Sequence, residues 1–440
     1  MADHSTAFYR AGAARIEITP PPALPYLAFA PRHQSFSGIH DPLWVRALHV
    51  SVGNRAVAVV NADLIGFADT LLGPGRSFVD EIKAEVTKAT GLAPDAILLA
   101  ASHAHSTPDT LDFRPLRESP GAVAWLEGVK IKIAAAVVTA RANAYPAELR
   151  TGRIEFTGYA KNRRGESCLD EGVELLQFTG VERAQKILVV NYACHPVIVQ
   201  VQSLISADFV GAMQHGVEAG LPGCDACLFL QGACGDINPR MEDSRDFRDV
   251  DEFGVALAAK VMELADRISQ KRPAPVAIAF AAETLELPSR DLPSQSEIHS
   301  LNQETSQLRA ARGEGREATG LDLQIASSIR INEEKLARIA EGVGPFEARL
   351  QAIRIGNTLL GAIPGEPPCC LAAETARRFQ PLQTMIVGFA NGYLGYILTP
   401  EQWARGGYEA ELGPWSKVSS ASYAIILDAL DRLGSKVNAA

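Results

Sequence analysis

The stretch Ala96–Thr110 reads AILLAASHAHSTPDT, and the interpretation of the whole chain starts from it. Its first half is an apolar run rich in Ile and Leu, which is typical of a buried β-strand. Two histidines, His103 and His105, follow at the polar end of this run. Residues two apart on an extended segment point the same way, so both imidazoles can face one point. Polar groups at the end of a buried strand commonly form the site of an α/β enzyme.

The composition is that of an ordinary globular protein. The chain has 440 residues, of which 47% are hydrophobic and 21% charged, so it can build a sizeable core. A net charge of −9 argues against a nucleic-acid partner. No apolar run is long enough to cross a bilayer, which predicts no integral membrane association. The N-terminal segment has no secretory-signal pattern and the seven cysteines are odd in number, which together predict reduced thiols in a cytoplasmic protein.

Strand-like and helix-like patterns alternate along the chain, which predicts an α/β fold of mixed β-sheets flanked by helices. Strands are expected over residues 11–22, 44–50, 55–64, 96–102, 148–157, 173–178, 187–192, 226–231, 276–287, 346–363 and 384–390. Helices are expected over residues 76–90, 122–143, 209–219, 250–268, 371–379 and 421–433. Because the sequence shows no internal repeat and no clear linker, residues 1–440 are predicted to form a single domain.

Residues 296–342 interrupt this alternation. The segment is polar and charged, with few β-branched runs, which favours one or two surface helices broken near Gly313-Glu314-Gly315. We interpret it as a solvated helical hairpin inserted into the fold. A lid or a dimerisation arm is the alternative, and a partner subunit of a homo-oligomer would be expected at this segment.

Four further polar clusters each follow an apolar strand. They are His195 in VVNYACHPV, Asp236 in QGACGDINPR, Glu366 in GAIPGEP and the three tyrosines of FANGYLGYILTPEQWARGGYE. Taken singly, each has a structural explanation, such as a hydrogen-bonded core histidine or a solvated turn glutamate. Taken together with the two histidines of the opening stretch, they predict one site at the ends of the strands. A histidine pair at a strand end suits zinc.

This ordered set of segments resembles the catalytic domain of the neutral ceramidase family. The resemblance implies that His103, in the segment HAHSTP, binds zinc and that His105 polarises the carbonyl of the substrate. It also implies three further zinc ligands: His195, Glu366 of the PGE turn, and Tyr396 of the segment YLGYILT.

Other matches extend the resemblance over residues 11 to about 420. Tyr408 lies at the spacing of a second functional tyrosine, and Asn162-Arg163 is similar to an Asn-Arg pair of the family. The family's signal peptide and C-terminal immunoglobulin-like domain have no counterpart in these residues. The family's nucleophilic serine lies in a GDxSPN segment, where this sequence reads GDINPR and places Asn238. Both departures argue against ceramide as the substrate.

These residues lead to the hypothesis of a zinc-dependent hydrolase that cleaves an amide or ester bond, with a C–N bond favoured, in a small soluble substrate. Without the serine, a metal-activated water is the expected nucleophile. His105 and Tyr408 would donate to the developing oxyanion, each contributing about 3–4 kcal/mol. Asn238 would orient the water or the substrate, with the carboxylate of Asp236 beside it, because an amide is not a strong nucleophile. Arg163 would contact a carboxylate or hydroxyl of the substrate.

Two other interpretations stay open. The first is an amidohydrolase-type metal hydrolase or lactonase, in which the histidine pair opens the site and His195, His215 and Asp236 complete it. In that class the pair lies on the first strand of a barrel, whereas here several strands precede it. The second is a non-catalytic relative that binds a metal or a ligand but has lost its nucleophile.

Overall fold

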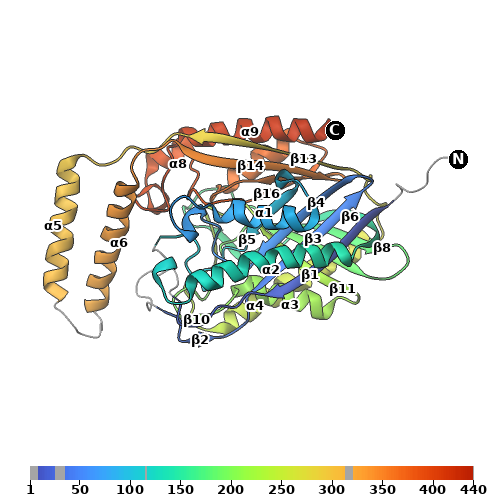
Figure 1. The fold of residues 1–440 in the computed structure, drawn as a ribbon, viewed down its shortest axis with the longest axis horizontal. Coiled ribbons are helices and arrows are strands. Elements are labelled where there is room, and N and C mark those ends of the chain that lie inside the picture. The colour runs from blue at the N-terminus through green and yellow to red at the C-terminus, as the bar shows by residue number, and fades with distance from the viewer. Residues whose placement is uncertain (1–7, 25–34, 114–115, 313–320, 440) are drawn as a thin grey trace.

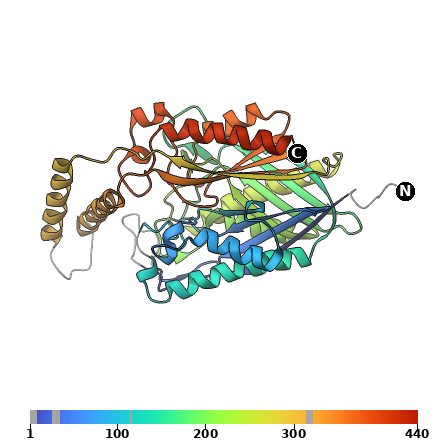
Figure 2. The same ribbon diagram turned by 45° about the horizontal axis from the view of Figure 1, so that its top comes forward.

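The computed structural model describes residues 8–24, 35–113, 116–312 and 321–439. Two β-sheets lie face to face, and helices cover the outer face of each sheet (Figures 1 and 2). The result is a four-layer arrangement of helices, large sheet, small sheet and helices. This arrangement confirms the predicted fold class of mixed β-sheets flanked by helices.

The large sheet contains eight strands in the order β11-β9-β8-β6-β1-β3-β4-β5. Their bounds are β1 (Tyr9–Glu17), β3 (Trp44–Val52), β4 (Arg55–Ala62), β5 (Ile97–Ala101), β6 (Tyr145–Glu155), β8 (Gly172–Gly180), β9 (Lys186–Tyr192) and β11 (Cys224–Gln231). The pairs β4–β5 and β9–β11 are parallel, and the other pairs are antiparallel. β3 and β4 form a hairpin, with Val52 opposite Arg55.

The small sheet contains four strands, in the order β13-β14-β15-β16. Their bounds are β13 (Ile278–Leu287), β14 (Phe346–Ile355), β15 (Thr358–Ala362) and β16 (Gln383–Val387), and β15 runs parallel to β16. The described residues also form two short strand pairs: β2 (Gly38–Ile39) with β10 (Leu204–Ile205), and β7 (Ala160–Asn162) with β12 (Ile237–Pro239).

Alternating side chains of the large sheet supply two separate cores, because successive residues of a strand point to opposite faces. On β4, Val57 and Val59 pack toward the small sheet, whereas Ala58 and Val60 pack toward the helices. The helices on that outer face are α1 (Phe78–Thr90), α2 (Ala122–Ala142), α3 (Asp208–Gly220) and α4 (Phe247–Ser269). Helices α7 (Cys369–Arg378) and α9 (Ala421–Asn438) cover the small sheet. The large sheet is therefore buried on both faces.

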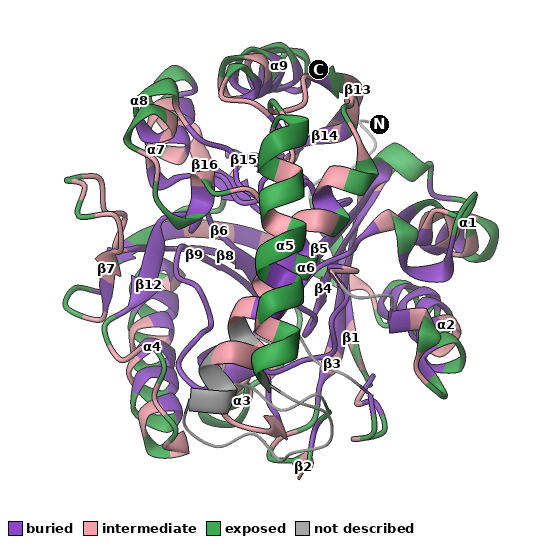
Figure 3. Ribbon diagram, turned by 90° about the vertical axis from the view of Figure 1, so that its left-hand side faces the viewer, coloured by how far each residue is buried: buried purple, intermediate pink, exposed green. Residues whose placement is uncertain are grey.

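The polar segment at residues 296–342 contains two helices, α5 (Gln295–Arg312) and α6 (Leu321–Glu341). Figure 1 shows them at one end of the molecule, with α5 farther from the sheets than α6. The exposed surface of α5 in Figure 3 fits its polar sequence. The predicted break near Gly313-Glu314-Gly315 lies outside the described residues. The description of residues 1–440 as a single domain stays a prediction.

Several predicted strands differ from the sequence pattern. The strand expected over residues 11–22 is β1, which ends at Glu17, before the prolines at positions 20–22. The run at residues 346–363 is two strands, because Gly356 adopts φ 64° and turns the chain between Ile355 and Thr358. Strand β16 ends at Val387, before the predicted end at Ala390, because the chain there leaves the small sheet and bonds to β5. Among the described helices, none is long and apolar enough to cross a membrane.

The contact between the two sheets should carry much of the stability. Leu98 of β5 is fully buried between them, so Leu98→Ala should lower the free energy of unfolding by about 2–5 kcal/mol through lost burial and a residual cavity. The exposed Val255 of α4 provides the control, because Val255→Ala should change stability by less than about 0.5 kcal/mol. Chemical denaturation of both variants measures this, and equal losses would contradict the packing.

Candidate metal centre

Five polar loops meet at one edge of the stacked sheets, where β5, β9, β11, β15 and β16 end. Backbone hydrogen bonds join the loops to one another. Ala101 N donates to Phe389 O at 3.2 Å, and Asn391 N donates to Leu99 O at 2.9 Å. On the other side, Gly235 N donates to Pro367 O at 2.9 Å. The strand ends that the sequence singled out are therefore neighbours in space.

The rings of His103 and His195 are oriented by backbone carbonyls. Nδ1 of His103 lies 2.6 Å from Ile65 O, and Nδ1 of His195 lies 3.1 Å from Ile237 O. A carbonyl oxygen can only accept, so each Nδ1 carries the proton and donates. Each Nε2 therefore presents its lone pair to the interior of the site, which is how metal-binding histidines are commonly oriented.

The lone pairs converge with the carboxylate of Glu366. Nε2 of His195 lies 3.1 Å from Oε2 of Glu366, and Nε2 of His103 lies 3.8 Å from the same oxygen. Nε2 of His103 also lies 3.1 Å from Nε2 of His105. Ligand atoms about 2.0–2.1 Å from a tetrahedral zinc ion are roughly 3.3 Å apart, so this donor set fits zinc. Acceptor atoms at these distances repel one another unless a proton or a cation lies among them.

Burial keeps both imidazoles in the form that binds metal. His103 is 1% exposed and His195 is fully buried, and desolvation lowers the pKa of each to about 3. Burial also raises the pKa of the Glu366 carboxyl, against the opposing effects of His103 and of hydrogen bonds from two tyrosines. The ligand atoms of His103, His105 and His195 all lie within 4.8 Å of one another.

Two tyrosines from the loop after β16 reach Glu366. The hydroxyl of Tyr393 donates to Oε1 of Glu366 at 2.6 Å. Tyr396 pairs with Glu366 through a parallel β-bridge, and its side chain lowers the pKa of the Glu366 carboxyl against the effect of burial. The sequence analysis included Tyr393 in this cluster of tyrosines but assigned a metal-binding role to Tyr396 alone.

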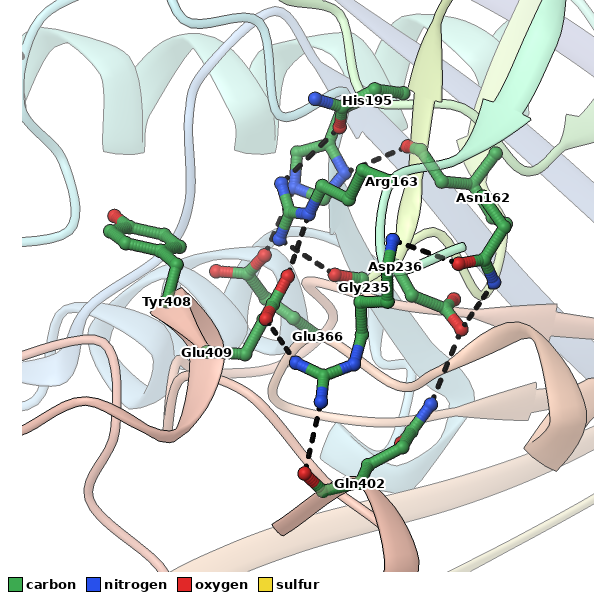
Figure 4. Close-up of polar contacts among 12 residues, drawn as sticks. Asn162, Arg163, His195, Gly235, Asp236, Glu366, Gln402, Tyr408 and Glu409 are labelled. Atoms are coloured by element: carbon green, nitrogen blue, oxygen red, sulfur yellow. Dashed lines mark hydrogen bonds and ion pairs between the residues drawn. The ribbon is translucent and has the colours of Figure 1, made fainter. Parts of the chain in front are cut away.

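Arg163 lies beside the centre and holds three groups together (Figure 4). Its Nε donates to Glu409 at 2.8 Å, Nη1 to Oδ1 of Asn238 at 3.2 Å and Nη2 to Gly235 O at 2.8 Å. The guanidinium carbon also lies 5.3 Å from the centre of the Tyr396 ring, which permits a cation–π contact.

Glu409 is a residue of this site that the sequence prediction did not include. Its carboxylate accepts from Arg163 and also from Arg164, and the Glu409 residue is 3% exposed. Arg164 in turn donates to the backbone oxygens of Gln402 and Gly406. The arginines therefore fasten the loop after β7 to the segment that carries Tyr408. The only sequence signal was the position of Glu409 directly after Tyr408.

Asn238, where the resemblance places a serine nucleophile, is held at both ends of its amide. Its oxygen accepts from Arg163, and its nitrogen donates to Glu242. Asp236 points to other partners: its oxygens accept from Cys369 N at 2.8 Å and from Asn162 at 3.0 Å. These contacts suit a residue that holds the loops together, and its catalytic role stays a prediction.

An open cavity of about 560 Å³ borders this cluster. Arg163, Asn238 and Tyr408 line it, together with other charged residues of the same loops. The ring of Tyr408 stacks on Trp415 with 4.9 Å between centres, and lies 6.0 Å from the ring of Tyr396. Tyr408, a predicted oxyanion donor, and Arg163, the predicted substrate contact, therefore line the same cavity.

Two solved structures share this fold. One is neutral ceramidase from Pseudomonas aeruginosa, with a TM-score of 0.72 and 18% identity over 98% of this chain and 75% of that chain. The other is a ceramidase complexed with C2, with a TM-score of 0.73 and 18% identity over 97% of this chain and 74% of that chain. The sequence matches no family profile, and no curated protein matches it significantly. The chain has the fold of a neutral ceramidase-like catalytic domain, which confirms the expected likeness.

The amidohydrolase arrangement is wrong for this fold. That arrangement needs a closed barrel of parallel strands, whereas the described strands form stacked sheets that are largely antiparallel. His215, which would complete such a site, is exposed on α3 and is absent from the group that His103 and His195 form among the described residues.

The convergent donors predict that purified protein binds about one zinc ion per chain. His195→Ala should reduce this content to near zero, because it removes a buried ligand atom 3.1 Å from Glu366. His215→Ala is the matched control and should keep full occupancy. Metal analysis after dialysis measures both, and full zinc in His195→Ala would contradict this site.

Proposed function

We propose that this protein is a zinc-dependent hydrolase of an amide or ester bond. One observation carries the proposal: the lone pairs of His103 and His195 converge with the Glu366 carboxylate in a buried site. Arg163, next to this site, lines an open cavity. The fold likeness to two ceramidases supports hydrolysis as the reaction class. The nature of the scissile bond, with a C–N bond favoured, is part of the proposal.

In this proposal His103, His195, Glu366 and Tyr396 hold the zinc ion. Zinc, when bound, supplies Lewis acidity that polarises a carbonyl and makes water more acidic. Burial keeps the two imidazoles neutral, so they compete for the metal without first losing a proton. Tyr393 keeps Oε1 of Glu366 engaged, which leaves Oε2 directed at the histidines.

His105 is proposed as the donor that polarises the substrate carbonyl. Its short distance to Nε2 of His103 also permits a role as a third histidine ligand. The two roles predict different zinc contents for a variant without His105. If His105 is a donor, the variant keeps the metal; if it is a ligand, the variant loses it. Tyr408 is proposed as the second donor, at the wall of the open cavity.

Water is the proposed nucleophile, because Asn238 occupies the position at which the resemblance places the nucleophilic serine. The Asn238 amide is oriented by Arg163 and Glu242, so it can position water or a substrate group without forming a covalent bond. Arg163 is proposed to contact a polar group of the substrate as well. Asp236 is proposed to act indirectly, by holding Asn162 and the start of α7 in place.

The proposed substrate is a small polar molecule, and a ceramide is not expected. The open cavity is lined by charged side chains that already pair with one another, as in the contacts of Arg163 with Glu409 and of Arg405 with Glu166. Such a lining accommodates hydroxyl or amide groups more readily than alkyl chains. Lactones belong to the same ester class and enter the test as substrates.

A panel of chromogenic amides, esters and lactones should reveal turnover that a chelator abolishes and zinc restores. Glu366→Gln should lower kcat/KM by at least about 100-fold, because it removes a ligand charge. His105→Ala should lose activity and keep zinc if His105 is a donor. His215→Ala should match the unmodified protein. Turnover that survives both the chelator and Glu366→Gln would contradict the proposal, and a panel without any turnover would favour the non-catalytic alternative.

Serine-directed fluorophosphonate probes should leave the active protein unlabelled. The reason is that Asn238 offers an amide in place of the serine hydroxyl that such probes modify. Gel fluorescence or mass spectrometry of the intact chain checks this, with a known serine hydrolase as the positive control. Stoichiometric labelling would mean that another serine is the nucleophile and that the water mechanism is incorrect.

A further inference from the structure

Two cysteines far apart in the sequence meet next to the candidate metal centre. The sulfur atoms of Cys168 and Cys369 lie 3.1 Å apart, across 201 positions of the chain. Cys369 is 1% exposed, whereas Cys168 is partly exposed. A cavity of about 290 Å³, lined by both cysteines, adjoins the pair and admits a small reagent.

The two cysteines belong to segments that carry site residues. Cys168 lies in the loop after β7, five positions beyond Arg163, and its carbonyl accepts from Asn162 at 2.9 Å. Cys369 begins α7, three positions after Glu366. The carboxylate of Asp236 bonds Cys369 N through one oxygen and Asn162 through the other. We call the loop after β7, which carries Arg163 and Cys168, the Arg163 loop, and the segment from Glu366 to Cys369 the Glu366 turn. The two thiols therefore lie where the Arg163 loop meets the Glu366 turn.

The sulfur atoms of the neighbouring cysteines make other contacts. The sulfur of Cys370 lies 3.9 Å from the hydroxyl of Tyr423, on α9. Cys224 lies on β11 in the large sheet, with Cys227 three positions further along. Among the seven cysteines, all of which lie in the described residues, Cys168 and Cys369 are the two whose sulfur atoms are in close contact.

We propose that Cys168 and Cys369 are an oxidation-sensitive thiol pair whose disulfide fastens the Arg163 loop to the Glu366 turn. The oxidant would be a hydroperoxide. The thiolate of Cys168, the more exposed partner, attacks one peroxide oxygen, which gives a sulfenic acid and releases hydroxide. The Cys369 sulfur then attacks the sulfenyl sulfur, so an S–S bond forms and water leaves. In total, two thiols lose two electrons, and hydrogen peroxide becomes two molecules of water.

The effect on catalysis rests on the proposed function, whereas formation of the disulfide does not. A bond between the two segments restricts their relative movement, and so changes how Arg163 meets a substrate next to the metal ligand Glu366. The bond also closes a long loop of the unfolded chain, which should raise the Tm by several degrees.

Peptide mapping of the full chain tests the pairing directly. After treatment with hydrogen peroxide and alkylation of the remaining thiols, non-reducing digestion should yield one linked peptide joining Cys168 to Cys369, which dithiothreitol separates. Cys168→Ser should abolish that peptide, and Cys224→Ser, the matched control, should leave it unchanged. The proposal would be overturned if Cys168 and Cys369 were both alkylated after peroxide treatment. A disulfide between Cys168 and Cys370 would overturn it as well.

Thermal unfolding provides a second readout that needs no enzyme activity. The oxidised unmodified protein should have a higher Tm than its reduced form, and the double variant Cys168→Ser/Cys369→Ser should show no such difference. An equal peroxide effect in the double variant would overturn the proposal. If the substrate panel shows no turnover, the proposed function fails while the mapped disulfide still stands, so the two failures are distinguishable.

Discussion

The buried carboxylate of Glu366 is the group on which the arrangement of the site depends. It is 2% exposed, so its charge has almost no contact with water and needs compensation from within the protein. Tyr393 donates to one of its oxygens, and the other faces the Nε2 lone pairs of His103 and His195. A cation among these atoms would relieve their mutual repulsion, which is the physical reason for expecting a metal here.

The backbone around His103 and in the segment after β16 holds the groups of the site in position. His103, Phe389 and Asn391 adopt positive φ angles of 67°, 53° and 58°, which are unfavourable for residues other than glycine. The ring of Phe389 stacks on that of His103 with 3.7 Å between centres. Hydrogen bonds to β5 hold the Phe389 segment against the sheet. The buried sheet edge thus maintains a strained conformation that a surface loop would relax, and the imidazole of His103 is oriented before any ligand arrives.

A second set of charges forms the outer part of the site. Glu409 lies between Arg163 and Arg164, and Arg163 also orients Asn238. These charges satisfy one another, so the loops at the cavity are held together without requiring a ligand. The metal centre and this outer cluster meet at Arg163, the guanidinium of which lies over the ring of Tyr396. In the proposed function, Arg163 would therefore connect the metal centre to the contact with the substrate.

The sequence alone determined the strands and the residues at their ends. Period-two alternation and apolar runs placed the bounds of β5, β9 and β11 within a few residues of those observed. The reason is that a buried strand needs apolar side chains at its own positions. The same logic indicated His103, His195 and Glu366 as neighbours. It missed the turn at Gly356 and extended β16 too far, because the pairing of β5 with the segment after β16 is not a local property.

Tertiary structure decided everything that depends on distances between distant segments. It brought Tyr393 to Glu366, set Glu409 between two arginines, and placed Cys168 beside Cys369 across 201 positions. Hydrogen bonds and ion pairs of this kind depend on the direction of a side chain, which the order of residues does not record. The sequence therefore named the groups that could bind a metal, and only the fold showed which atoms face one another.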